Sequence, residues 1–131
     1  MRNVPTKEEL EMIRDYCLLP IMLAIVENSR KQIEYSVALS IKQLYLAATD
    51  ALLYRIRADL TAVKSGLREH GIKVFEDERQ DKNGRYYRFV CRGYEDKFAL
   101  IRDLIRAEVS VRLGSYIAEV IREAGQTSKT N

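Results

Sequence analysis

The chain has 131 residues, of which 47% are hydrophobic and 31% are charged. This composition is typical of one folded domain and excludes a chain that is disordered throughout. The net charge of +3 is small, which argues against the concentrated positive surface of a dedicated nucleic-acid binder. We therefore predict a single helical domain over residues 1–125, followed by a flexible tail over residues 126–131.

The segment Met1–Arg14 is polar and charged, which is not the pattern of a secretory signal. The longest apolar run, Tyr16–Val26, has about eleven residues and contains Pro20, whereas a membrane-spanning helix needs ~20. Cys17 and Cys91 lie far apart in the sequence, so we expect two reduced, partly buried thiols, with a single disulfide as the alternative. These patterns together predict a cytoplasmic protein.

Two short helices are predicted near the start of the chain. Thr6 and Glu9 have the spacing of a capping box, which predicts a first helix over residues 6–18. Pro20 has no backbone N–H and disfavours a helical conformation in the residue before it, so a kink or break is expected there. Pro20 also suits the first turn of a second helix over residues 20–27.

A regular repeat of leucines predicts one long helix in the middle of the chain. The spacing of seven residues keeps one side of a helix apolar over many turns, and that side must be buried. Ser29–Gln32 fits a second capping box after a turn at residues 28–29, and no strong stop signal follows before Gly66. We expect a helix from about Arg30 to Glu69, with Thr49 as the one place for a kink. The leucines of the repeat are Leu39, Leu46, Leu53, Leu60 and Leu67.

A β-hairpin is predicted near residues 72–92, directly after the long helix. Gly71 can adopt the left-handed conformation that ends a helix. Ile72–Phe75 is rich in strand-forming residues, and Asn83–Gly84 is a strong turn signal, so residues 86–91 should return as the second strand. In this register Glu76 or Glu78 would lie beside Arg88.

The last predicted element is a helix from about Glu95 to Glu123. Glu95 and Asp96 carry the negative charge that suits a first helical turn. The predicted fold is therefore mostly α, a helical bundle with one long helix and a single β-hairpin between the last two long helices. The apolar stripe of the last helix consists of Phe98, Ile101, Leu104, Ile105, Val109, Leu113, Tyr116, Ile117 and Val120.

Three short segments resemble a known family. They are Tyr16–Leu23, Leu67–Val74 and Arg92–Glu95. In these segments the chain is similar to small uncharacterised helical proteins from Bacillus-type, spore-forming bacteria, and the similarity extends roughly over residues 16–117. The resemblance implies a bacterial source of that type and a helical fold. It implies no catalytic residue, because the family has none that can be transferred to this chain.

The sequence has no recognisable pattern of catalytic or metal-binding residues. His70, the one histidine, has no nucleophile or orienting carboxylate suitably placed beside it, so we interpret it as a helix C-terminal residue near free carbonyls. One histidine and two distant cysteines do not match a zinc site. The acidic run at residues 76–78 is interpreted as a solubilising strand edge, and the glycines do not have phosphate-loop spacing. We predict no enzymatic activity, cofactor, metal site or small-molecule substrate.

The leading hypothesis is a non-enzymatic interaction or regulatory module that acts through protein–protein association. An elongated bundle has few elements to cover its apolar seams, so a protein partner or a second copy would bury what is left exposed. A homodimer would form most simply by pairing the last helix with its copy. The candidate interface residues are Leu113, Tyr116, Ile117 and Val120.

The alternative hypothesis is a DNA-binding regulator in which the long helix and the hairpin act as recognition helix and wing. Acidic residues interrupt the candidate basic set, and the predicted long helix lacks the short turn of a helix-turn-helix motif, so this reading is the weaker one. The candidate nucleic-acid contacts are Arg55, Arg57, Lys64, Arg68, Lys73, Lys82, Arg85 and Arg88.

Overall fold

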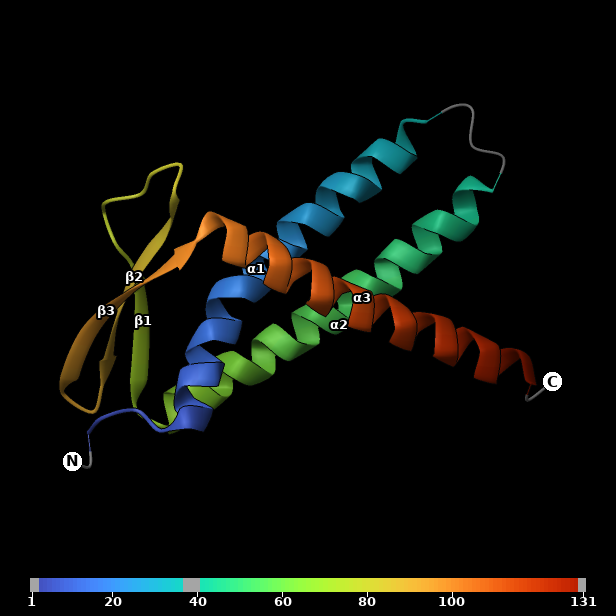
Figure 1. Ribbon diagram of the computed structural model, residues 1–131. Coiled ribbons are helices and arrows are strands. Elements are labelled where there is room, and N and C mark those ends of the chain that lie inside the picture. Colours follow the sequence, from blue (N-terminus) through green and yellow to red (C-terminus); the bar gives the residue numbers. More distant parts are fainter. Residues whose placement is uncertain (1–2, 37–40, 130–131) are drawn as a thin grey trace.

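The structure is a computed structural model that describes residues 3–36 and 41–129. Helices α1 and α2 form an antiparallel pair, α3 crosses them, and a small sheet packs at one end (Figure 1). This confirms a mostly α fold with a hairpin-type sheet between helices. The flexible tail at 126–131 stays a prediction. The elements in chain order are α1 (Lys7–Glu34), α2 (Lys42–Glu69), β1 (Ile72–Glu76), β2 (Gly84–Cys91), β3 (Tyr94–Ile101) and α3 (Arg102–Lys129).

Helix α1 begins where the sequence predicts and then continues through the predicted break. Thr6 Oγ1 accepts a hydrogen bond from the N–H of Glu9 at 3.2 Å, and Glu9 Oε1 accepts one from the N–H of Thr6 at 2.9 Å, which confirms the capping box. Pro20 lies inside the helix, so the predicted break and the turn at residues 28–29 are wrong. Leu19 and Met22 beside it are buried. Burial of each such side chain contributes ~1.5–3 kcal/mol, and several together outweigh the ~3 kcal/mol cost of an internal proline.

The helix predicted from Arg30 to Glu69 is two helices in the structure, because α1 ends at Glu34 and α2 begins at Lys42. Thr49 lies inside α2, where its Oγ1 donates to the carbonyl oxygens of Tyr45 and Leu46 in the preceding turn. The leucine repeat is used in packing α2 against α1 and the sheet. Leu53 and Leu67 are buried, Leu46 and Leu60 are partly buried, and Leu39 lies outside the described residues.

The sheet has a third strand that the sequence analysis did not predict. Residues 95–101, expected as the first turns of the last helix, belong to β3, and α3 begins only at Arg102. A two-residue turn joins β2 to β3, with φ of 49° at Arg92 and 92° at Gly93. Positive φ at both central residues is what such a hairpin turn requires. Phe98 and Leu100 have the strand period, whereas Phe98 and Ile101 have the helical one, and pairing with β2 decides between the two.

A longer loop over residues 77–83 joins β1 to β2. The predicted two-residue turn at Asn83–Gly84 therefore does not connect the strands, and these residues lie in a smaller turn that Asp81 and Gly84 close just before β2. The register places Phe75 opposite Arg88, so the predicted pairing of Arg88 with the acidic run at 76–78 is wrong. The guanidinium of Arg88 lies 4.4 Å from the centre of the Phe75 ring. Its carboxylate partner is Glu95 on β3, at 3.1 Å.

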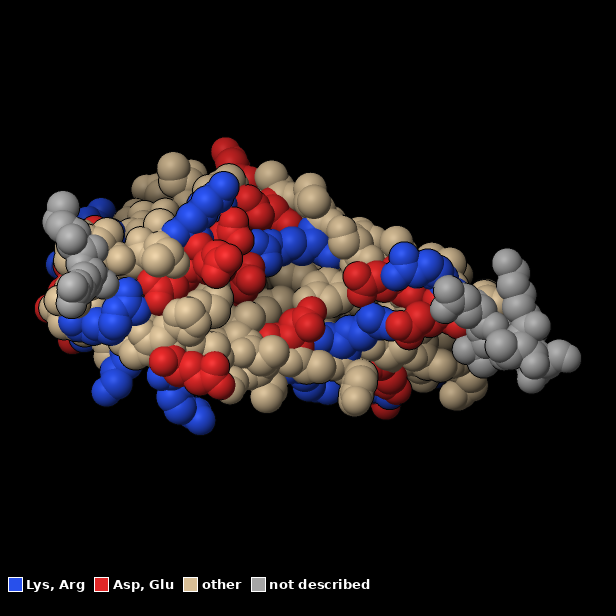
Figure 2. Space-filling view, turned by 90° about the horizontal axis from the view of Figure 1, so that it is seen from below, with Lys and Arg blue, Asp and Glu red and all other residues tan. Residues whose placement is uncertain are grey.

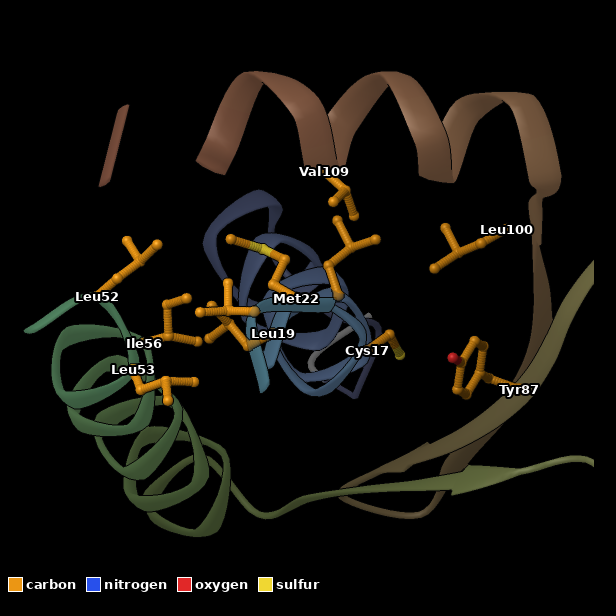
Figure 3. Packing of buried hydrophobic residues seen from close by; sticks show 11 residues of the cluster. Cys17, Leu19, Met22, Leu52, Leu53, Ile56, Tyr87, Leu100 and Val109 are labelled. Atoms are coloured by element: carbon orange, nitrogen blue, oxygen red, sulfur yellow. The ribbon is translucent and has the colours of Figure 1, made fainter. Parts of the chain in front are cut away.

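The main core lies where the three helices meet the inner face of the sheet. Side chains from α2, α3 and the sheet surround those of α1, which is seen end-on (Figure 3). A second cluster lies near the end of α2 and includes Leu67, Ile72 and Phe89. Cys17 and Cys91 are buried and form no disulfide. Over the part of the chain that the structure describes, no helix has the length and apolar character needed to cross a membrane. The main core contains Cys17, Leu18, Leu19, Met22, Val26, Leu52, Leu53, Ile56, Tyr87, Leu100 and Val109.

Candidate functional site

Glu9 is a charged residue that the fold buries almost completely, with 3% of its surface exposed. Its Oε2 lies 2.8 Å from both Arg92 Nη1 and His70 Nδ1, and its Oε1 lies 3.1 Å from Arg92 Nη2 and 2.9 Å from the N–H of Thr6. The partners come from the start of α1, the end of α2 and the β2–β3 turn. We call Glu9, His70 and Arg92 the clasp, because they join three parts of the chain.

These hydrogen bonds lower the pKa of Glu9 from 4.5 to about 2. The largest cause is the bond from Arg92, followed by the N–H of Thr6; burial acts in the opposite direction, and His70 adds a smaller lowering. Glu9 therefore stays ionised near neutral pH. The sequence analysis missed this partner of His70 because 61 positions separate the two residues and Glu9 already had a role as a capping residue.

The thiols of the protein do not add an activated nucleophile to the clasp. Burial raises the pKa of Cys91, which neighbours Arg92, and burial raises the pKa of Cys17 to about 12. Cysteines with raised pKa values are poor nucleophiles and poor metal ligands. Within residues 3–36 and 41–129, no group of three or more His, Cys, Asp or Glu side chains could hold a metal ion. We therefore interpret the clasp as a structural connection between elements.

A groove runs between the helices and strand β1. It has two adjoining parts, of about 310 and 460 Å³, and both are lined by Tyr16, Lys64, Val74 and Phe75. The smaller part extends along α1 past Pro20, and the larger one extends along the end of α2. Both volumes fall in the ~300–1,000 Å³ range that is common for binding pockets.

The larger part of the groove has an apolar floor and a basic mouth. Leu67 and Ile72 in its lining are buried, whereas Lys64, Arg68 and Lys73 are exposed. No aspartate or glutamate lines this part. Among the described residues, no carboxylate lies within 4.0 Å of the charged group of any of these three cations.

The structure divides the eight basic residues proposed for nucleic-acid contact into two groups. Lys64, Arg68 and Lys73 lie at the groove, and Lys82 lies in the loop before β2. Acidic and basic side chains alternate across the face shown in Figure 2, so no uniform positive surface forms there. The other four are already ion-paired, Arg55 with Glu119 and Glu123, Arg57 with Glu27, Arg85 with Glu76 and Arg88 with Glu95.

Most of the residues proposed for a dimer interface contribute to the fold of the chain itself. Leu113, Tyr116 and Val120 are partly buried against the main core. The hydroxyl of Tyr116 donates to the Asp59 carboxylate of α2, and burial raises the pKa of that hydroxyl. Ile117 is the member that remains accessible, with 47% of its surface exposed.

Comparison with known proteins gives one family match. The family model described as YhjD protein matches residues 4–121, which include the clasp, the groove and most of α3. No curated protein and no solved structure matches the chain. The bacterial source that the sequence resemblance implied stays a prediction, because the family match names no organism.

Proposed function

This chain belongs to the YhjD protein family, and we propose that it is a non-enzymatic interaction module that binds another protein in the groove beside β1. The observation that supports this proposal is the set of three unpaired cations at the mouth of an apolar groove. Several arginines elsewhere in the molecule, such as Arg55, Arg57 and Arg88, instead pair with a carboxylate of the same chain.

The groove combines apolar surface with charged side chains, which are the two components of a protein interface. Partly buried Tyr16 and Val74, together with Phe75 at 38% exposure, would lose contact with water when a partner covers them. Removing apolar surface from water contributes ~25 cal/mol per Å². The surrounding cations would select the partner and speed its association. We further propose that the module works in the cytoplasm, where its two unpaired thiols stay reduced.

Association with a second copy is a further form of the same proposal. Val111 is 71% exposed and Ile121 is 66% exposed, and both lie on α3 with Ile117. A symmetric contact between two copies of α3 would bury these side chains. Light scattering at micromolar concentration tests it, and a strictly monomeric mass would contradict self-association.

A photocrosslinking experiment tests the groove directly. Lys73 lines the groove and is exposed, so a benzophenone amino acid at this position should capture the partner as a discrete protein adduct in cells. Lys97 on β3 is also exposed but does not line the groove, and the same probe there is the matched control. Adducts of equal pattern and yield from both positions, or none from Lys73, would contradict the proposal.

Retention on a random DNA duplex at low salt separates protein association from the DNA-binding alternative. A nucleic-acid binder would be retained and then released by added salt. We expect little retention, because Arg85 and Arg88 of the proposed wing are paired with Glu76 and Glu95. Strong retention that is lost on R85A with R88A would favour the alternative.

A further inference from the structure

We infer that the groove takes an extended acidic segment of the partner, which pairs with β1 as an additional strand. The inference rests on the proposed function and specifies the chemistry and conformation of the bound segment. It follows from the hydrogen bonds of β1 and from the charges that surround the groove.

The backbone bonds of β1 show which of its groups face the rest of the sheet. The strand order is β1-β2-β3, so β1 is an edge strand. The N–H of Asp77 donates to the carbonyl of Tyr86 at 2.9 Å, and the N–H of Arg92 donates to the carbonyl of Gly71 at 3.1 Å. Antiparallel strands alternate between bonded and non-bonded pairs. Positions 71, 73, 75 and 77 therefore bond to β2.

Ile72, Val74 and Glu76 must then turn their N–H and C=O groups away from β2. Among the residues that the structure describes, no backbone group outside the sheet is bonded to these three. Ile72 is buried, so the accessible groups belong to Val74 and Glu76, and both residues line the groove. An edge with outward N–H and C=O groups can take another strand, which is the known mode of β-strand addition.

The charges around this edge favour an acidic segment. Glu76 lines the smaller part of the groove, but its carboxylate lies 3.9 Å from Arg85 Nη1, so the cations of the larger part are in excess. Lys64 and Arg68 lie one turn apart on α2, and Lys73 lies on β1, so a strand placed in the groove would have cations on both sides. The side chains of such a strand alternate between its two faces. Alternating apolar and acidic residues would therefore cover the apolar floor and meet the cations.

A second copy of β1 is a poor occupant of the same edge. Pairing two copies would bring two sets of Lys64, Arg68 and Lys73 together, and like charges oppose association. Lysine on an edge strand is a known protection against such edge-to-edge pairing. A polynucleotide could meet the cations, but its backbone has no peptide groups to bond to Val74 and Glu76.

Binding of a synthetic peptide tests the charge requirement. The probe is a fluorescein-labelled peptide of alternating glutamate and valine, and its counterpart has lysine in place of glutamate. We expect the acidic peptide to bind the full chain with a Kd on the order of 10 μM and the basic peptide to bind at least about tenfold more weakly. Equal binding of both peptides would overturn the inference.

A matched pair of triple variants locates the binding. K64Q with R68Q and K73Q should weaken the acidic peptide by about tenfold or more, since three charge contacts are lost. The control, K31Q with K82Q and K97Q, removes three exposed cations outside the groove and should change the affinity less than about twofold. Equal losses in the two variants would show a general charge effect and overturn the inference.

N-methylation of the peptide tests strand pairing without altering the protein. In a paired strand only alternate N–H groups face β1. Methylation of the valine nitrogens and methylation of the glutamate nitrogens should therefore differ, with one peptide losing binding and the other keeping it. Loss of binding on methylation at the valines would indicate antiparallel pairing, in which a valine opposite Val74 has its side chain on the same face of the sheet. Loss of binding on methylation at the glutamates would indicate parallel pairing. Retained binding by both methylated peptides would overturn the inference.

Two further outcomes separate this inference from the proposed function. If a probe at Lys73 captures a protein but the acidic peptide does not bind, the interaction module stands and the acidic-strand inference is wrong. If random single-stranded DNA competes with the peptide at equal charge concentration, the groove binds polyanions in general, and the inference is again wrong. Failure of the DNA to compete supports recognition of the peptide backbone.

Discussion

Both the clasp and the groove contain an arginine, but Arg92 of the clasp pairs with a buried carboxylate, whereas Arg68 at the groove forms no ion pair within the described residues. In the clasp, the buried carboxylate of Glu9 accepts hydrogen bonds from Arg92, His70 and the backbone of Thr6. At the groove, exposed cations surround an apolar floor and no acidic residue lines the larger part. Neither the residue type nor the sequence position of these cations shows whether a carboxylate pairs with them in the folded chain. Only the packing of distant elements shows this.

The two regions are joined by the end of α2. His70 follows the last helical residue, and Gly71, with φ of 69°, leads directly into β1. Arg92 Nη1 also donates to the carbonyl of His70 at 2.8 Å, which fixes the backbone at the start of the edge strand. The clasp therefore stabilises the position of β1, while the groove leaves one side of β1 open.

The largest stability effect should come from removing the carboxylate of the clasp. E9A breaks a buried ion pair and a capping box together, and we expect a loss of ~2–4 kcal/mol in the free energy of unfolding. Urea denaturation measures the loss. E8A is the matched control, since Glu8 is exposed in the same first turn, and it should cost less than ~0.5 kcal/mol. Equal losses in the two variants would show that the clasp contributes no more than an exposed carboxylate.

The pH dependence of stability provides the second test. Folding lowers the pKa of Glu9 from 4.5 to about 2, so its contribution is complete above about pH 5. As the pH falls from 5 towards 2, protons bind the unfolded chain more readily at this site, and the contribution is lost. Urea unfolding midpoints across this range should therefore fall more steeply for the wild type than for E9Q. Parallel curves would assign the acid sensitivity to other carboxylates.

A smaller loss should follow from changing His70. Its side chain is 44% exposed and provides one of the bonds to Glu9, while Arg92 still pairs with the carboxylate in the variant. We expect H70A to lower the free energy of unfolding by ~0.5–1.5 kcal/mol, the usual range for one hydrogen bond. In E9Q, where the charge of the acceptor is already gone, the same change should cost less. Full additivity in this double-mutant cycle would show that the two residues are not coupled.

The sequence revealed those features whose partners are close in the chain. Thr6 and Glu9 lie three residues apart, and both halves of their capping box were visible. The bond from Arg92 to Glu9 spans 83 positions, and no sequence pattern connects the two. Lys64 was among the predicted basic residues, but so was Arg55, which α3 neutralises in the folded protein. Packing between distant elements decides which cations stay available.

The errors in the predicted elements have the same origin. Pro20 is tolerated because burial on both sides of it holds α1 together. Strand β3 was missed because Phe98 and Ile101 fit the helical period of the residues that follow them and because the β2–β3 turn begins with an arginine. Arginine rarely adopts positive φ, so it gives no turn signal. The hydrogen bonds of Arg92 in the clasp accompany this unusual backbone conformation and explain why it is held.

The smallest stability effect should come from the groove, and it is the sharpest test of the contrast with the clasp. Lys64, Arg68 and Lys73 are exposed and form no ion pair within the described chain, so K64Q with R68Q and K73Q removes no intramolecular bond. We expect the free energy of unfolding to change by less than ~0.5 kcal/mol, because surface substitutions of this kind have little effect. Added salt should reduce even that difference, since it screens repulsion among the cations of the wild type. A loss as large as that of E9A would mean that these cations hold the fold together. Unchanged stability combined with lost peptide binding would instead show that these cations contribute to binding and not to the stability of the fold.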